Sequence, residues 1–395
     1  MSHTLDEAKA LFETLVAWRR DFHRHPEIGL QEHRTSSIVA ETLNELGYEI
    51  EEGIAGTGVI GLLKNGDGPV MMTRVDMDAL PIQEINNVPY ASENSGVMHA
   101  CGHDAHVAMG LGVATLMAHH RDAWRGTLKL IFQPGEEGMN GAEIMVDEGA
   151  LENPRPAAAL ALHVWNTLPV GTFGVSSGPV MAAAEAWEAE IVGNGGHAAQ
   201  PERTVDPVVI AAMTVNNLQT VVSRNVGARE SAVVTVGLLR SGDTFNVIPE
   251  RADLQGTVRT YDPTVRETVL RRVRKVIEGT AEMMDASATL DFKALTPAVV
   301  NDAEVTGVVQ EAARHLFGEA TLKEEQTMGS EDAAFFLQEI PGCYIFIGSG
   351  FTDRDAPPHH NPRFDIDERA LVNGVALTVE SLRRLMPVKA PTGDA

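Results

Sequence analysis

The stretch TLKLIFQPGEEG, residues 127–138, joins a run of apolar and β-branched side chains to a turn that carries two adjacent carboxylates. A short apolar run that ends in proline and glycine predicts a strand buried on both faces. Helical patterns at residues 5–22, 104–120 and 141–152 precede runs of this kind or alternate with them. The alternation predicts an α/β fold with a mostly parallel, doubly wound sheet. The other predicted strands are GVIGLLK at 58–64, VMMTRVD at 70–76, AALALHV at 158–164 and CYIFIGSG at 343–350.

Residues 183–294 follow a different pattern. Their order is strand, helix, two strands, helix and strand, which is the β-α-β-β-α-β arrangement of ferredoxin-like folds. We therefore expect a first domain in two parts, residues 1–182 and 295–395, with residues 183–294 inserted between them as a separate domain. The final stretch PVKAPTGDA is expected to be unstructured.

Composition limits the partners that this chain can have. The 395 residues include 31 Lys and Arg against 55 Asp and Glu, a formal net charge of -24. Such a surface repels phosphate backbones and anionic lipids, so we expect neither nucleic acid nor a membrane as partner. No apolar run approaches the roughly 20 residues that cross a bilayer, and the N-terminal stretch mixes charges, so we expect a cytoplasmic protein. Two cysteines indicate no disulfide scaffold.

Metal-binding side chains gather where predicted strands end. Open α/β sheets bind ligands beyond the carboxyl ends of their strands, so side chains from these places are expected to meet. Cys101 and His103 in MHACGHDAH (98–106) lie just before a predicted helix. Three other stretches lie at or after strand ends, and their side chains are Glu136 with Glu137, then His163, and then His359 with His360.

Cys101 lies two residues from His103, with a glycine between them, so both side chains can reach one point. A nearby helix N-terminus favours the thiolate, and a thiolate beside imidazole and carboxylate suits zinc or another borderline transition ion. A buried, inert cysteine is the usual alternative. The three other clusters at strand ends favour the interpretation of Cys101 as a metal ligand.

Two pairs of carboxylates have distinct expected roles. Glu136 and Glu137 point in different directions, so one can hold a metal while the other handles protons on a water; a solvated acidic turn is the alternative. Asp76 and Asp78 in RVDMDALP (74–81) lie on one face of a strand end. We expect Asp78 to orient a ligating histidine, and we assign Asp76 no more than a capping role.

The remaining histidines carry weaker signals. His99 and His106 flank the metal-binding cluster and are candidates for orienting ligands, whereas His23, His25 and His33 are expected to pack or to face solvent. The glycines of GNGGHAAQP suggest a backbone that approaches something closely, and this segment places His197 in the inserted domain.

Together, several stretches resemble the hippurate hydrolase, auxin-conjugate hydrolase and N-acyl-amino-acid amidohydrolase branch of the aminoacylase-type metallopeptidases. The matches run in order from about residue 19 to residue 370. They are HRHPEIGLQEHRTS, RVDMDALPIQE, MHACGHDAH, FQPGEEGMNGAEIMVDEGAL, ALHVWNTLPVG, GHAAQPE, NVIPERADLQGTVRT, MGSEDAAFF and HHNPRFDIDERAL.

The resemblance implies two divalent metal ions, Zn, Mn, Co or Ni, with Cys101 bridging them and Glu136 as the general base. Asp76 occupies the place of a metal-binding histidine in the wider superfamily, and the histidine of CGH takes over as ligand in this branch. The implied ligands are Cys101, His103, Glu137, His163 and His360.

The resemblance also assigns roles in the inserted domain, which it implies is a lid and dimerisation domain. His197 would stabilise the developing oxyanion, often from the other subunit, and Asn246 and Arg259 would bind the substrate carboxylate. GSED (329–332) would line the pocket. A homodimer or a higher homo-oligomer follows as an expectation.

The expected function is a metal-dependent amidohydrolase that cleaves N-acyl-L-amino acids, hippurate-like or N-acetyl, to a carboxylic acid and a free amino acid. A dipeptidase or carboxypeptidase with the same binuclear site is the alternative. A cysteine amidase that uses Cys101 and a non-enzymatic metal-binding protein are the hypotheses from other classes.

Overall fold

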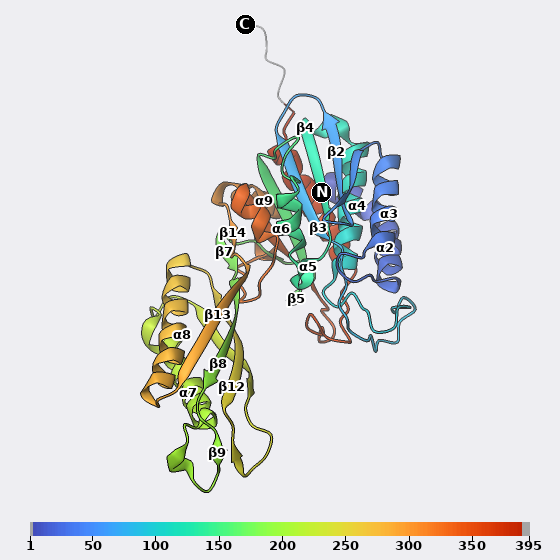
Figure 1. The fold of residues 1–395 in the computed structure, drawn as a ribbon. Coiled ribbons are helices and arrows are strands. Elements are labelled where there is room, and N and C mark those ends of the chain that lie inside the picture. The colour runs from blue at the N-terminus through green and yellow to red at the C-terminus, as the bar shows by residue number, and fades with distance from the viewer. Residues whose placement is uncertain (1–2, 389–395) are drawn as a thin grey trace. The chain divides into compact units, whose positions relative to one another are not determined.

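The computed structural model describes residues 3–388 and divides into two compact units (Figure 1). Unit 1 comprises the chain up to Val180, Val300–Gln326, and the chain from Asp332 onward. Unit 2 comprises Met181–Val299 and Thr327–Glu331. Most of the predicted unstructured tail, residues 389–395, lies outside the described residues.

Unit 1 is built on an eight-stranded sheet with the order β1-β2-β4-β3-β5-β16-β6-β15. Its four central strands, β4, β3, β5 and β16, are parallel neighbours, whereas β2 pairs antiparallel with β4. The sequence therefore predicted the α/β class and the mostly parallel sheet correctly. The bounds are β1 (Glu49–Ile54), β2 (Gly58–Asn65), β3 (Val70–Asp76), β4 (Gly126–Gln133), β5 (Ala158–Pro169), β6 (Phe173–Gly174), β15 (Leu322–Lys323) and β16 (Gly342–Gly350).

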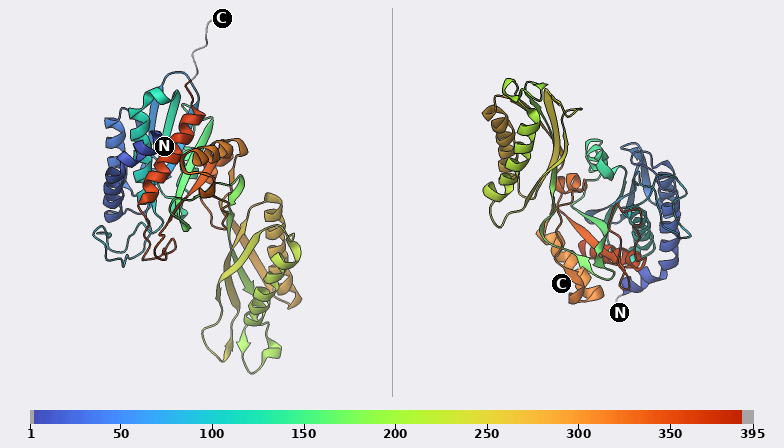
Figure 2. Two further views of the ribbon diagram at one scale, coloured as in Figure 1. Left: turned by 180° about the vertical axis from the view of Figure 1, so that it is seen from behind. Right: turned by 90° about the horizontal axis from the view of Figure 1, so that it is seen from below.

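Alternating side chains of the central strands pack into separate cores on the two faces of this sheet. On β4, Leu128, Leu130 and Phe132 face a core that includes side chains of α2, α4 and α11, whereas Ile131 faces a smaller core with α6 and α10. The left view of Figure 2 shows α11, in red, against the sheet. The helices of unit 1 are α1 (His3–Ala10), α2 (Phe12–Arg24), α3 (His33–Glu45), α4 (His103–His119), α5 (Glu136–Met139), α6 (Gly141–Asp147), α9 (Ala303–Phe317), α10 (Ala334–Glu339) and α11 (Arg369–Leu385).

Two predicted helices are shorter than the apolar spacing indicates. The helical pattern at 5–22 is divided at Leu11, and its halves serve different partners because α1 packs on α11 and α2 packs on α4. The helix predicted at 141–152 ends at Asp147. Glu148 accepts a hydrogen bond from the backbone N–H of Ala55 at 2.6 Å, which fixes the chain as it leaves α6.

Unit 2 has the predicted β-α-β-β-α-β order, and its four-stranded antiparallel sheet has the order β10-β12-β8-β13. Asp206 and Asp262 accept hydrogen bonds from the first turns of its two helices, each of which begins with a proline. The elements are β8 (Ala183–Val192), α7 (Pro207–Asn225), β10 (Ala232–Arg240), β12 (Arg251–Thr260), α8 (Pro263–Met283) and β13 (Ser287–Thr296).

Shorter elements complete the described chain. β9 and β11 form a two-stranded ribbon in unit 2, and β7 and β14 belong to the segments that lead into and out of the insertion. Their bounds, with those of three short 3₁₀ helices, are β7 (Gly178–Met181), β9 (Gly196–His197), β11 (Val247–Ile248), β14 (Val299–Asn301), η1 (Arg121–Ala123), η2 (Pro201–Arg203) and η3 (Glu319–Thr321).

Membrane insertion was not expected from the sequence. Across residues 3–388, every helix is too short or too polar to span a bilayer. The cytoplasmic location stays a prediction.

Trp187 is the largest side chain in the core of unit 2, and only 1% of its surface is exposed. It lies directly opposite Gly256 on β12, where an added Cβ would come within 2.4 Å of the indole ring. The missing side chain of Gly256 therefore makes room for the indole, which packs with Ile210 of α7 and Val269 of α8 in one apolar cluster.

We predict that Trp187→Ala destabilises unit 2 by about 3–5 kcal/mol, because it leaves a large cavity in this core. Hydrogen exchange of the backbone amides of β8 and β12 measures the loss. Trp187→Phe is the control and should cost less, since the indole N–H has no hydrogen-bond partner among the described residues. Unchanged amide protection in Trp187→Ala would contradict the assignment.

Candidate metal centre

Five side chains from four separate stretches of unit 1 form two overlapping groups of possible metal ligands. Within each group, the ligand atoms all lie within 4.8 Å of one another. Cys101 belongs to both groups, so its sulfur can bridge two ions. The groups are Cys101, His103 and His163, and Cys101, Glu137 and His360.

The turn before α4 brings Cys101 and His103 to this point. Gly102 lies between them with φ at 91°, and a Cβ there would lie 2.4 Å from Cγ2 of Val164. Glycine is therefore required both by the backbone conformation and by the close approach to β5. The backbone N–H of His360 donates to the carbonyl of Ala100 at 2.8 Å, which joins the segment after β16 to the same turn.

Hydrogen bonds on the outer side of two imidazoles leave Nε2 of each ring for a metal. Nδ1 of His163 donates to the carbonyl of Val164 at 2.6 Å, and Nδ1 of His103 lies 3.2 Å from Oδ1 of Asp78. Nε2 of His163 lies 3.5 Å from Sγ of Cys101. Nε2 of His103 is buried and has no hydrogen-bond partner among the described residues. Metal-ligating histidines are commonly fixed in this way.

Asp78 connects two of the ligand segments. One of its carboxylate oxygens binds His103, and the other accepts the backbone N–H of Glu137 at 2.9 Å. The structure thus places Asp78 where it orients a histidine and also holds the turn after β4.

Asp76 and His106 form a buried pair beneath the candidate ligands. Asp76 accepts hydrogen bonds from Nδ1 of His106 and, at 2.8 Å, from Arg74. Nε2 of His106 accepts the backbone N–H of Val164 at 2.9 Å, next to His163. Both nitrogens of His106 are therefore used, which makes the pair a support for β5 instead of a further set of ligands.

The electrostatics of the cluster favour bound cations. Burial, followed by Glu137 and Glu136, raises the pKa of the Cys101 thiol well above its ordinary value. Burial opposes the charge of His103, but Asp76 and Asp78 outweigh it and raise the pKa to about 10. Burial and neighbouring His106 lower the pKa of His163, so this imidazole stays neutral, as a ligand must. A bound cation would stabilise the Cys101 thiolate and would displace the proton from His103, which must also be neutral to bind metal.

Glu136 lies beside the candidate ligands at the start of α5. Its carboxylate is within 4.8 Å of the ligand atoms of His103 and Glu137. The turn that carries it is held by Glu32, which accepts the backbone N–H of Gly135 at 2.9 Å and the hydroxyl of Thr57. The arrangement places a carboxylate of partial exposure next to the point where two ions would be held.

The three predicted residues of the inserted segment lie in unit 2. His197 pairs with Val247 in the ribbon of β9 and β11, and the carbonyl of Asn246 accepts the N–H of Ala198 at 3.2 Å. Arg259 lies on β12, half-buried, and donates to the carbonyl of Val258 at 3.2 Å. The structure brings His197 and Asn246 together on the exposed ribbon, while Arg259 belongs to the main sheet of this unit.

Asp332, the last residue of GSED, is fully buried in unit 1. It accepts hydrogen bonds from the side chain of Gln133 at 2.7 Å and from the backbone N–H of Ala142 at 2.9 Å. These contacts join the end of β4 to the start of α6.

A buried ionic network next to the candidate ligands was not predicted from the sequence. His23, expected to pack or to face solvent, is hydrogen-bonded to Asp104 at 2.8 Å, and Nε of Arg19 donates to the same oxygen at 2.9 Å. A signal was present, because Arg19 and His23 are four residues apart on the helix face that also carries the buried Leu15. His359 was a candidate ligand beside His360 before the family resemblance singled out His360, and its Nε2 donates to the carbonyl of Val164 at 3.0 Å.

Comparison with known proteins identifies the family. Residues 72–384 match the family described as peptidase family M20/M25/M40. The chain belongs to this family. The solved structure of the Bacillus subtilis YXEP protein, described as a dinuclear metal binding peptidase from the M20 family, is similar with a TM-score of 0.84 and 36% identity, covering 96% of this chain and 99% of that one.

Relatives in the M20 family carry several activities in their names. An N-acetylcysteine deacetylase of Bacillus subtilis is 40% identical over 92% of this chain and 94% of its own length. An Arabidopsis thaliana IAA-amino acid hydrolase, ILR1-like 4, is 37% identical over 98% and 90%. Thermostable carboxypeptidase 2 of Saccharolobus solfataricus is 34% identical over 93% and 94%.

We predict that loading with divalent metal protects Cys101 from thiol reagents and that removal of the metal with a chelator exposes it, because a coordinated thiolate is not free to react. Titration of the native protein with an aromatic disulfide measures this. Cys343 should stay unreactive in both states because it is fully buried. Cys101 is partly exposed, and its raised pKa makes the reaction of the metal-free protein slow at neutral pH and faster at alkaline pH. Cys101→Ser is the control and should show no metal-dependent thiol. Equal reactivity of Cys101 with and without metal would contradict its role as a ligand.

Proposed function

We propose that this M20 hydrolase cleaves N-acyl-L-amino acids, hippurate-like or N-acetyl, to a carboxylic acid and a free amino acid. Family membership makes the chain a hydrolase that acts on amide bonds. The observation that carries the proposal is the pair of ligand groups that share Cys101, with Glu136 beside them. A protein that only stored metal would have no use for that additional carboxylate.

The donor set fits two divalent ions of Zn, Mn, Co or Ni. Thiolate and imidazole suit borderline transition ions, and His103 offers a buried nitrogen without a hydrogen-bond partner among the described residues. When bound, such ions lower the pKa of a shared water and polarise the amide carbonyl. One ion would be held by Cys101, His103 and His163, and the other by Cys101, Glu137 and His360.

Proton transfer is the task of Glu136 in this proposal. Its carboxylate accepts a proton from the attacking water and then delivers that proton to the amide nitrogen as the C–N bond breaks. Asp78 keeps the imidazole of His103 and the backbone of Glu137 in place during both transfers. The products are a carboxylate and a free amine.

Residues of unit 2 supply the recognition that the proposal requires. His197 stabilises the negative charge on the carbonyl oxygen, and Asn246 and Arg259 bind the carboxylate of the amino acid. A homodimer or a higher homo-oligomer is part of the proposal, and the edge strand β10 offers backbone groups for pairing between subunits.

A carboxypeptidase or dipeptidase with the same centre is the second candidate. The similarity to thermostable carboxypeptidase 2 supports this second candidate. A dipeptide differs from an N-acyl amino acid because it carries a free ammonium group next to the scissile amide.

A substrate panel with metal control tests the proposal. We expect the purified full chain to hydrolyse hippurate and N-acetyl amino acids faster than dipeptides. A chelator should abolish the activity, and one of the four metals should restore it. Faster cleavage of dipeptides would favour the peptidase instead. Activity that resists the chelator but is lost on thiol alkylation would indicate a cysteine amidase.

We predict that Glu136→Gln lowers kcat by about 10²–10⁴-fold, because a carboxamide cannot accept the proton of water. Metal content measured by elemental analysis should stay unchanged, since Glu136 belongs to neither group that includes Cys101. Glu143→Gln is the matched control. It removes an exposed carboxylate of α6 that accepts a hydrogen bond from the side chain of Asn140 at 3.0 Å, and it should leave kcat unchanged. Full activity in Glu136→Gln with metal bound would remove Glu136 as the base.

A further inference from the structure

We infer that Arg19 is a positioning residue that holds the two halves of the proposed metal centre in register, by joining the segment with Cys101 and His103 to the segment with His360. The inference rests on the proposed function. It assigns a task to a helix that carries no candidate ligand and that is separated from both segments by long stretches of chain.

Three carboxylates from these two segments converge on the guanidinium of Arg19, which is fully buried. Nε donates to Asp104 at 2.9 Å, Nη2 to Asp365 at 2.9 Å, and Nη1 to Glu368 at 3.2 Å. Asp104 directly follows His103, and Asp365 follows His360 by a short loop. One side chain therefore fixes the distance between the two ligand-bearing segments.

Arginine suits this task for geometric reasons. Its planar guanidinium carries five N–H donors in a rigid fork, so it can bind several carboxylates in set directions. A lysine ammonium keeps the charge but is a single point with rotatable donors. Burial opposes the charge of Arg19, but Asp104 and Asp365 outweigh it and keep its pKa well above the ordinary value, so the side chain is a permanent cation.

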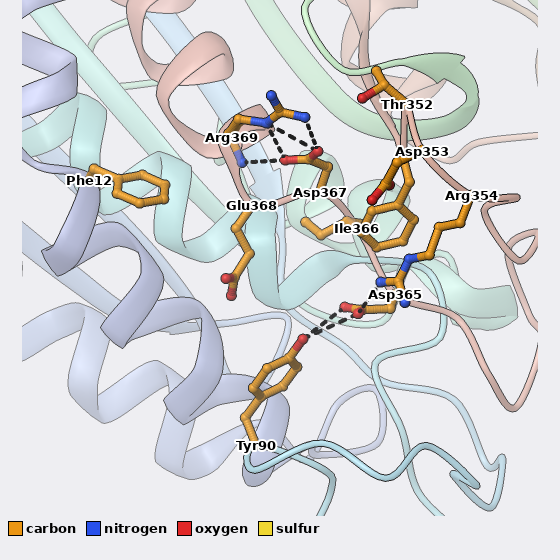
Figure 3. A pocket seen from close by; sticks show the side chains of 11 residues that line it. Phe12, Tyr90, Thr352, Asp353, Arg354, Asp365, Ile366, Asp367, Glu368 and Arg369 are labelled. Carbon is orange, nitrogen blue, oxygen red and sulfur yellow. Dashed lines mark hydrogen bonds and ion pairs between the residues drawn. The ribbon is translucent and has the colours of Figure 1, made fainter.

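The hydrogen-bond network around Arg19 is shielded from solvent at Asp104 and reaches a pocket at Asp365. Asp104 is fully buried and also binds His23, which in turn lies 3.3 Å from Glu84. At the outer end, Tyr90 donates to Asp365 on the wall of a pocket of about 550 Å³, as Figure 3 shows. Asp104, at the buried end, is next to the candidate ligand His103. Its charge depends on Arg19 because solvent cannot reach this carboxylate and take the place of the cation.

Direct contacts between the two segments show what Arg19 would preserve. The backbone of His360 donates to Ala100, next to Cys101. Removing Arg19 would leave Asp104 with His23, Glu368 with Arg20 and Asp365 with Arg354 as cationic partners, none of which joins the two segments. The repulsion between the carboxylates would then rise and act across this contact. Cys101 would then no longer reach both groups of ligands at once.

The test compares Arg19→Lys and Arg19→Met with Arg383→Lys and Arg383→Met in the full chain. Arg383 is a matched control because it is largely buried and binds Glu7 at 2.8 Å and Thr4 at 2.9 Å, but it joins α11 to α1, neither of which carries a ligand. The probe is Co²⁺ added to metal-free protein. The readouts are Co²⁺ affinity by chelator competition and the thiolate-to-cobalt absorption band of Cys101.

We expect both Arg19 variants to bind Co²⁺ about 10–100-fold more weakly than the wild type, as is typical when a residue that orients ligands is lost. Their thiolate-to-cobalt band should weaken or shift, and excess metal should restore kcat only in part. The Arg383 variants should lose thermal stability to a similar extent yet keep the wild-type affinity and band. This contrast separates positioning from a general structural role.

Two results would overturn the inference. A folded Arg19→Lys and a folded Arg19→Met with wild-type Co²⁺ affinity and band would remove Arg19 from the centre and leave the proposed function intact. A wild-type chain without any thiolate-to-cobalt band would defeat the proposed centre itself. If neither Arg19 variant folds, Asp365→Asn, which removes one partly exposed partner, carries the test. A weaker affinity in Asp365→Asn supports the inference, and an unchanged affinity overturns it.

Discussion

A thiol buried among carboxylates cannot ionise without a nearby positive charge, and unit 1 is organised around that constraint. Burial and Glu137 raise the pKa of Cys101, while Asp76 and Asp78 raise the pKa of His103. Burying this cluster of thiol, imidazole and carboxylate groups without a cation is unfavourable, whereas bound cations would compensate its negative charge. The carboxyl ends of parallel strands are the natural place for it, because loops from distant parts of the chain meet there.

Hydrogen bonds support the candidate ligands in successive layers around this point. Asp78 and the carbonyl of Val164 fix the imidazoles, and Glu32 fixes the turn that carries Glu136. Fully buried Arg74 lies beneath them and binds Asp76 and Asp332. Each layer uses groups whose partners come from different elements, so the geometry of the ligands depends on the whole sheet being formed.

Much of this arrangement could be predicted from the sequence, and the rest could not for a physical reason. Period and length identified β4, β5 and the six main helices and strands of unit 2, because strands and helices impose local patterns. They did not indicate that Thr327–Glu331 belongs to unit 2. Strand ends indicated Cys101 and Glu137, but only the family resemblance distinguished His360 from His359. Pairings such as Arg19 with Asp104 or His106 with Asp76 depend on how remote segments meet, and a single sequence carries no local pattern for that. The break at Leu11 was missed because tertiary partners of α1 and α2, and not propensity, divide the helix.

The place of β16 has a consequence for how the polypeptide matures. This strand lies between β5 and β6 inside the sheet, yet it is made of residues 342–350, late in a chain of 395. During translation the edge of β5 therefore waits unpaired while β8, β12 and β13 of the insertion have already emerged and can pair with one another. His360 leaves the ribosome later still. A nascent chain that has not yet reached His360 thus carries an incomplete set of the candidate ligands, and the proposed second group of ligands forms only after this segment has joined the turn at Ala100.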